Sequence, residues 1–220
     1  MKFPNAEKGV RKIFGAEIIS LISAILLGVA TVIAIVMSKT MNLNSGGAAA
    51  SGIAMLAIFS AGSIMLIVGG IMELVGYFQA SKDEDGFKKA FYCIIISLIF
   101  SFIGGFFSGS AIGWVGAALK VVSQVMQLAA FIFAINGLMN LAANCNRQDM
   151  VQKGSTILKL LVCTYIFSFI MIILTSIFTS YAVNRTLAII FTVVSLILSI
   201  VQYVLYLSYL NRSKKMLAEN

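Results

Sequence analysis

Long apolar segments alternate with short polar connections along the whole chain. Each segment reaches or exceeds the roughly 17–25 residues that an α-helix needs to cross a bilayer. A helix satisfies its own backbone hydrogen bonds, as the lipid interior requires. The pattern therefore predicts an all-α, polytopic membrane protein, with one domain over residues 1–220 and six transmembrane helices. We expect these at Ile13–Met37, Gly52–Phe78, Phe91–Phe107, Val115–Leu141, Ile157–Tyr181 and Leu187–Leu210.

Basic residues outside these segments predict the orientation of the chain. The connections on one side of the membrane contain only Lys39 and Arg185. Cytoplasmic connections carry an excess of Lys and Arg, so both termini are expected in the cytoplasm of a multi-pass cell-membrane protein. The basic residues of the cytoplasmic side include Lys2, Lys8, Arg11, Lys82, Lys88, Lys89, Arg147, Lys153, Arg212, Lys214 and Lys215.

Composition agrees with a membrane class. The 220 residues are 60% hydrophobic and 11% charged, with a mean hydropathy of +1.00, whereas soluble domains are roughly 45–50% apolar and about 25% charged. The net charge of +8 is explained by topology and contact with anionic lipid. We therefore expect the lipid bilayer as a partner and no nucleic acid.

Short sequence matches predict internal repeats. The stretch Gly70–Leu74 resembles Gly137–Leu141, and Ile99–Ile103 resembles Ile166–Ile170, with the same separation along the chain in both pairs. A shared separation across two helices favours repetition over coincidence. We expect three parallel two-helix repeats, at about 1–80, 81–147 and 148–215.

Small residues recur at helix-contact spacing. In Gly52–Phe78 they are spaced by seven, and in Val115–Leu141 they follow alternating steps of three and four. Small residues let helix backbones approach closely, so these positions are expected to form packing faces, or to bind a second copy or another membrane protein. They are Gly62, Gly69, Gly76, Ala130, Ala134 and Gly137, together with the GxxxG series Gly105, Gly109 and Gly113 near the other membrane surface.

Glu73 is the only charged residue between Ile53 and Phe78. A carboxylate inside the bilayer costs roughly 2.5–3.5 kcal/mol and is a functional candidate by default. Its repeat counterpart is Asn140, and Tyr206 is a looser third match. These residues, with Gln127 and Gln202 deeper in the bundle, are our candidate ligands for a small solute or cation. The structural alternative is that they form hydrogen bonds between helices.

Catalysis is not expected. The chain has no histidine, which removes imidazole acid–base chemistry and histidine-ligated zinc or haem. The Walker A, HExxH and GxSxG patterns do not occur. Glu17 is the other acid inside a span, and we expect it at the interface near Arg11 and Lys12. We predict no enzyme, no cofactor and no metal site.

Two functions remain open. The first is binding or transport of a small solute or cation through the helix bundle. The second is a non-catalytic accessory, assembly, immunity or sensor subunit that binds other membrane proteins through its small-residue faces.

Overall fold

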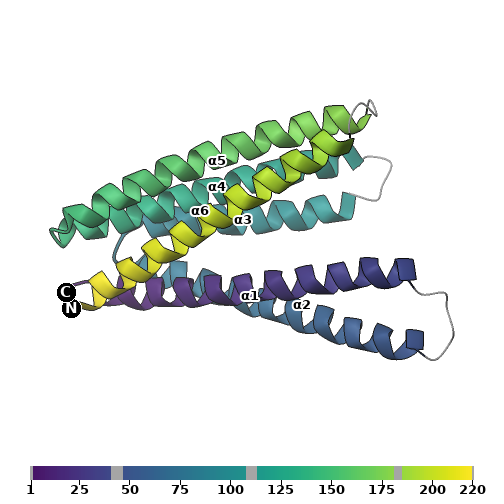
Figure 1. Ribbon diagram of the computed structural model, residues 1–220. Helices are drawn as coiled ribbons and strands as arrows, with labels where there is room; N and C mark the ends of the chain where they lie inside the picture. Colours follow the sequence, from purple (N-terminus) through teal and green to yellow (C-terminus); the bar gives the residue numbers. More distant parts are fainter. Residues whose placement is uncertain (1, 41–46, 108–112, 181–184, 220) are drawn as a thin grey trace.

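The chain is all-helical wherever its fold is described. The computed structural model describes residues 2–40, 47–107, 113–180 and 185–219, while most side chains within 32–40, 47–54, 168–180 and 185–199 are not described. The described chain forms six helices, shown in Figure 1: α1 (Pro4–Thr40), α2 (Gly47–Ala80), α3 (Asp85–Phe107), α4 (Gly113–Asn144), α5 (Gln148–Ser180) and α6 (Arg185–Glu219). The all-α prediction is confirmed.

Four of these helices are long and apolar enough to cross a membrane. In the parts with described side chains, the candidate spans are Pro4–Thr31, Met55–Ala80, Asp85–Phe107 and Trp114–Asn144. These four helices are compatible with an integral membrane protein. That α5 and α6 also cross the membrane stays a prediction.

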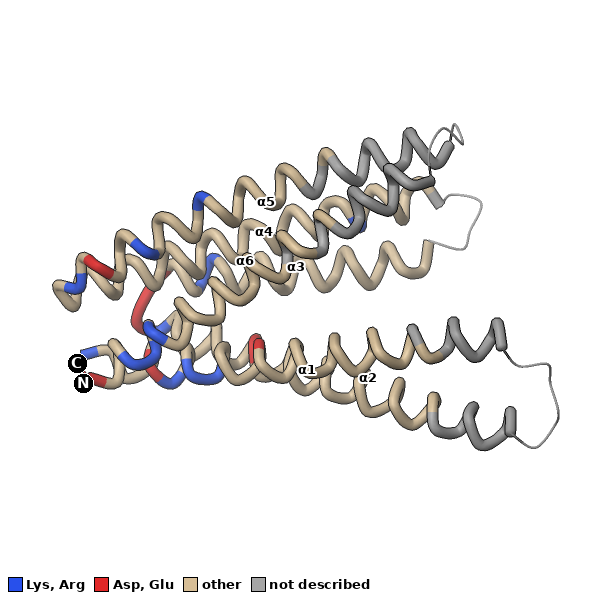
Figure 2. The backbone as a smooth tube through the Cα atoms, in the orientation of Figure 1, with Lys and Arg blue, Asp and Glu red and all other residues tan. Residues whose placement is uncertain are grey.

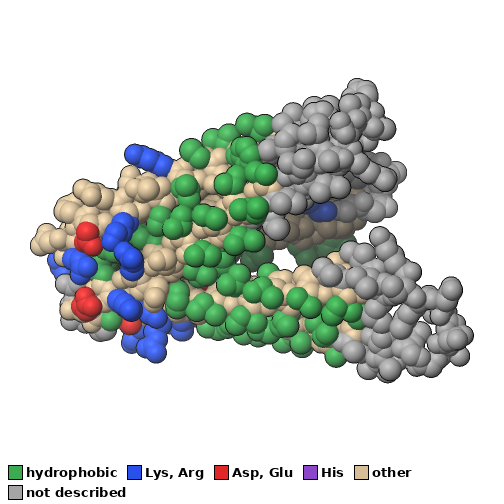
Figure 3. All heavy atoms as spheres, viewed as in Figure 1, with side chains coloured by type: hydrophobic (Ala, Val, Ile, Leu, Met, Phe, Trp, Pro, Cys, Tyr) green, Lys and Arg blue, Asp and Glu red, His purple; other side chains and the backbone are tan. Residues whose placement is uncertain are grey.

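The surface has an apolar band beside a charged end. Lys, Arg, Asp and Glu gather at the end where both termini lie, and hydrophobic side chains cover the adjoining part of the molecule (Figures 2 and 3). Large side chains such as Leu56, Phe102 and Phe106 are about 70% exposed (71%, 70% and 71%). Such a surface suits contact with lipid, because burying apolar side chains in hydrocarbon carries no free-energy penalty, whereas exposing them to water does.

The helices pack as consecutive hairpins. α1 pairs closely with α2, and α3 with α4, whereas α5 and α6 make a looser pair. α4 contacts α5, and α6 crosses back to α1 at the charged end, so the last helix meets the first (Figure 1).

Glycines bring α1 and α2 together. Gly62, Gly69 and Gly76 are buried, and a side chain at these positions would meet Leu27, Ser20 and Ile13 of α1, at 2.8, 2.9 and 2.7 Å. The Ser23 Oγ also donates to the Gly62 carbonyl oxygen at 2.6 Å. The seven-residue spacing therefore marks the face of α2 that packs on α1.

The α3–α4 contact follows the same principle. Gly86 meets the backbone of Gly137, where an added Cβ would lie 2.8 Å from the Gly137 Cα. Further along, the Ser97 and Ser123 hydroxyls lie 3.0 Å apart and each bonds the other residue's carbonyl oxygen, at 3.0 and 2.9 Å. Close packing of small residues and interhelical hydrogen bonds thus hold α3 and α4 together. Such contacts drive helix association where the hydrophobic effect does not act.

Polar groups at the charged end define where helices start and stop. The Asp83 carboxylate, in the α2–α3 turn, accepts the backbone N–H groups of Asn5 and Ala6, both at 2.8 Å, and so caps the N-terminus of α1. At the other turn, Asn146 has φ 57°. The Asn146 and Arg147 N–H groups return to the carbonyl oxygens of 143 and 142, the pattern of a Schellman C-cap on α4.

Candidate functional site

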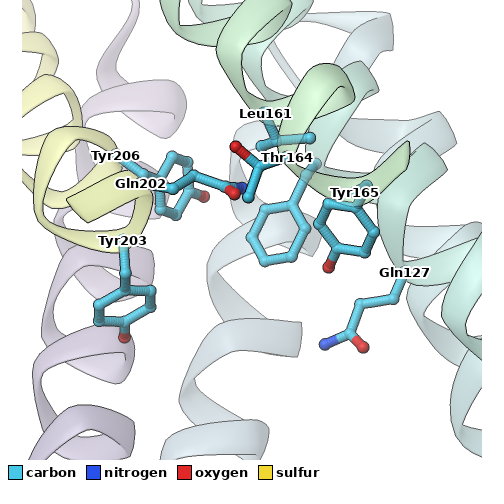
Figure 4. A pocket seen from close by; sticks show the side chains of 8 residues that line it. Gln127, Leu161, Thr164, Tyr165, Gln202, Tyr203 and Tyr206 are labelled. Carbon is cyan, nitrogen blue, oxygen red and sulfur yellow. The ribbon is translucent and has the colours of Figure 1, made fainter. Parts of the chain in front are cut away.

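One cavity lies among α4, α5 and α6. Its volume is about 380 Å³, at the lower end of the roughly 300–1,000 Å³ of small-molecule sites. Figure 4 shows side chains of all three helices turned toward this space. The lining combines amides, hydroxyls, aromatic rings and one leucine: Gln127, Phe131, Leu161, Thr164, Tyr165, Gln202, Tyr203 and Tyr206.

A smaller cavity of about 100 Å³ adjoins it on the side of α2 and α3. Gln127 and Phe131 line both cavities, so the two spaces are neighbours at these side chains. The smaller cavity contains Glu73 and Tyr77 of α2, with Ser97 of α3 opposite. The two neighbouring cavities are lined by residues of α2 to α6.

Glu73 is the acidic group in this lining. Within the described part of the chain, no side chain forms a hydrogen bond or an ion pair with its carboxyl group, and no lysine or arginine is among the described residues that line either cavity. Glu17 is close enough to interact with Glu73 electrostatically. A group that brings positive charge or hydrogen-bond donors would find an available acceptor at Glu73.

Tyr206 supplies a buried hydroxyl next to these cavities. The residue is 3% exposed. The Tyr77 side chain is close enough to hydrogen-bond with the Tyr206 hydroxyl. The Phe131 ring packs edge-on against the Tyr206 ring, with the centroids 5.3 Å apart. Buried phenol hydroxyls usually pair with another polar group, and this tyrosine pair beside the cavities is a candidate ligand contact.

Glu17 is not the interfacial residue that we expected near Arg11 and Lys12. It is 7% exposed, and the Tyr203 hydroxyl of α6 lies 2.8 Å from both its Oε2 and its backbone oxygen, toward which it donates. The expectation failed because it considered α1 alone, whereas the crossing of α6 buries this face. Glu17 thus holds Tyr203, a lining residue of the larger cavity, in place.

The structure brings together Glu73, Gln127, Gln202 and Tyr206, but it does not place Asn140 with them. Asn140 is exposed, and its amide nitrogen donates to Glu84 Oε1 at 2.9 Å, outside both cavities. The repeat alignment of the sequence put Asn140 level with Glu73. Helix contacts put it near the α2–α3 turn instead.

The predicted packing positions are divided between contact and open faces. Ala130, Ala134 and Gly137 are buried in α4. On α3, Gly104 packs against Gly116 while Gly105 has nothing within 4 Å of an added Cβ. The remaining two members of the GxxxG series are Gly109, which lies outside the described residues, and Gly113, which begins α4 and whose surroundings are not described.

Sequence reasoning missed the aromatic half of the site. Tyr165, Tyr203 and Phe131 line the large cavity, yet none stood out among 7 tyrosines and 16 phenylalanines. Gln202 and Tyr206 share a helix face at i and i+4, with Tyr203 beside them. Tyrosines well inside a predicted span, away from its interfacial ends, were the available indication.

In the described chain there is no group of three or more Cys, Asp or Glu side chains that would hold a metal ion. No family model, curated protein or solved structure matches this chain.

Proposed function

We propose that this protein is a six-helix, multi-pass membrane protein that binds or translocates a small solute or cation through its interior. The observation that carries the proposal is the Glu73 carboxyl, which has no polar partner among described residues and lines a cavity that adjoins a larger one. No described lining residue supplies a compensating positive charge. A bound ligand would supply it.

The lining favours a cationic ligand among small solutes. Aromatic faces attract cations within about 6 Å of the ring centroid, and more strongly where water is excluded. Tyr165, Tyr203, Tyr206 and Phe131 offer such faces, while Gln127 and Gln202 offer amide oxygens. Gln127 and Phe131 also line the smaller cavity with Glu73, so a ligand there would meet the carboxyl group, an amide oxygen and an aromatic ring.

Transport is tested by charge removal in reconstituted protein. In liposomes, monovalent inorganic cations and small primary and quaternary amines are applied as gradients, and the current is recorded. Glu73→Gln is expected to abolish the current while elution from a sizing column is unchanged. Glu7→Gln is the matched control, because this carboxyl group lies in the first turn of α1, away from the cavities. A current that survives Glu73→Gln unchanged would exclude Glu73 as a ligand.

A specific surface feature favours the second function, a non-catalytic accessory subunit. Gly105 has open space where a side chain would project, beside the exposed rings of Phe102 and Phe106. Such a face fits a neighbouring helix of another protein or of a second copy. In that case the purified protein conducts nothing, and Gly105→Leu removes a stoichiometric partner that co-purifies from the native membrane.

A further inference from the structure

A third cavity opens between α5 and α6 at the charged end. Its volume is about 530 Å³. Lys153 and Arg212 line it together with Ile157, Leu160 and Leu205, and none of these residues belongs to the two cavities described above. This site is therefore separate from the proposed solute site.

Its lining changes from basic to apolar along the helices. On α5, Lys153 precedes Ile157 by one turn and Leu160 by two. On α6, which runs the opposite way, Arg212 follows Leu205 by two turns. The predicted spans begin at Ile157 and end at Leu210, so the two cations lie just outside the hydrocarbon and the leucines lie inside it. An amphipathic molecule at the membrane surface has the same order of groups.

The charge balance of the cavity favours an anion. Asp149 also lines it, but the Arg147 Nε donates to the Asp149 Oδ1 at 3.2 Å, and this bond holds the pKa of Asp149 below its usual value. Lys153 and Arg212 form no ion pair with any described residue. Two cations therefore face a carboxylate that already has a partner.

We propose that this cavity binds an anionic phospholipid. Its phosphate lies between Lys153 and Arg212, and an acyl chain follows Leu160 and Leu205. Basic pockets between transmembrane helices on the cytoplasmic side bind anionic head groups in this way. A water-soluble phosphate compound fits less well, because the two leucines are 39% and 41% exposed and would give it no favourable contact.

Lipid titration of the purified full-length protein tests the proposal. Phosphatidylglycerol and phosphatidylcholine with the same acyl chains are added in detergent, and bound lipid is counted by native mass spectrometry. The double variant Lys153→Gln/Arg212→Gln is expected to bind phosphatidylglycerol roughly 30-fold more weakly, from about fivefold for each basic residue near an anionic surface. The control Lys88→Gln/Lys159→Gln loses the same charge at two exposed positions outside the cavity and should keep the wild-type affinity.

Three results would overturn the proposal. They are an equal loss in the control variant, equally tight binding of phosphatidylcholine, and displacement of the lipid by soluble glycerol phosphate at comparable concentration. If the double variant does not fold, Leu205→Ser gives a second test. It should weaken binding of long-chain but not short-chain phosphatidylglycerol, and an unchanged long-chain affinity would contradict the assignment of the acyl path.

Discussion

Gly9→Ala is expected to destabilise the protein, because it forces α1 away from α2. A Cβ at this position would lie 2.5 Å from the Gly76 carbonyl oxygen and 2.6 Å from the Ala80 nitrogen. Both are backbone atoms, so no side-chain rotation relieves the contact. Reaching an ordinary 3.4 Å contact requires a shift of about 0.9 Å (3.4 − 2.5) between two packed helices.

The magnitude follows from two opposing effects. Overpacking a well-packed contact costs about 1–3 kcal/mol, and a backbone clash belongs near the upper value. In the opposite direction, alanine stabilises the helix by about 1 kcal/mol relative to glycine, because its helix propensity is higher. The free energy of unfolding should therefore fall by about 2 kcal/mol, which corresponds to a fall in Tm of about 4–8 °C for a protein of this size.

The assay heats detergent-solubilised protein in steps and measures the fraction that remains monodisperse on a sizing column. Gly28→Ala is the matched control, since an added Cβ there has nothing within 4 Å; its Tm should equal or slightly exceed that of the wild type. Equal melting temperatures for the two variants would refute the reasoning that close backbone contact holds this hairpin together.

Three further predictions concern the α3–α4 contact and the charged end. Ser97→Ala should destabilise the protein by roughly 0.6 kcal/mol per lost interhelical bond, and Ser123→Ala should add little more in the same thermal assay, because the two hydroxyls act together. Asn146→Val should cost about 1–2 kcal/mol, since a β-branched residue resists φ 57°, while Asn146→Gly should be tolerated. The hydrogen bond from Arg147 lowers the pKa of Asp149. The small stabilising effect of this bond is therefore present above the ordinary carboxyl range and is lost as pH falls through the lowered pKa. Arg147→Gln should raise the pKa of Asp149 in an NMR titration, and an unchanged pKa would contradict the assignment.

Helix positions and packing faces were accessible from sequence because they depend on local patterns. Seven-residue spacing of Gly62, Gly69 and Gly76 identified the face of α2 that meets α1. Apolar length identified the four helices that, in the parts with described side chains, are long and apolar enough to cross a membrane. In both cases the physical requirement, a close backbone approach or a hydrocarbon thickness, acts on residues of one helix.

Which residues of different helices lie at the same height along the bundle could not be predicted from sequence, because this depends on how the hairpins pack. Gly86 lies at the start of α3, directly after the α2–α3 turn, and it meets the backbone of α4 at Gly137. This contact places Gly137 near the end of α2 rather than level with Gly70, its partner in the repeat alignment. Asn140 consequently falls beside the α2–α3 turn and not beside Glu73. The internal repeat stays a prediction.

The bond between Glu17 and Tyr203 joins residues 186 positions apart, which has a consequence for biosynthesis. A membrane protein is made from its N-terminus, so the first hairpin is complete long before α6 is translated. During that interval the Glu17 carboxyl has no Tyr203 to bind. A chain cut short before α6 would therefore leave this buried-site carboxyl without the hydroxyl that donates to it in the complete fold.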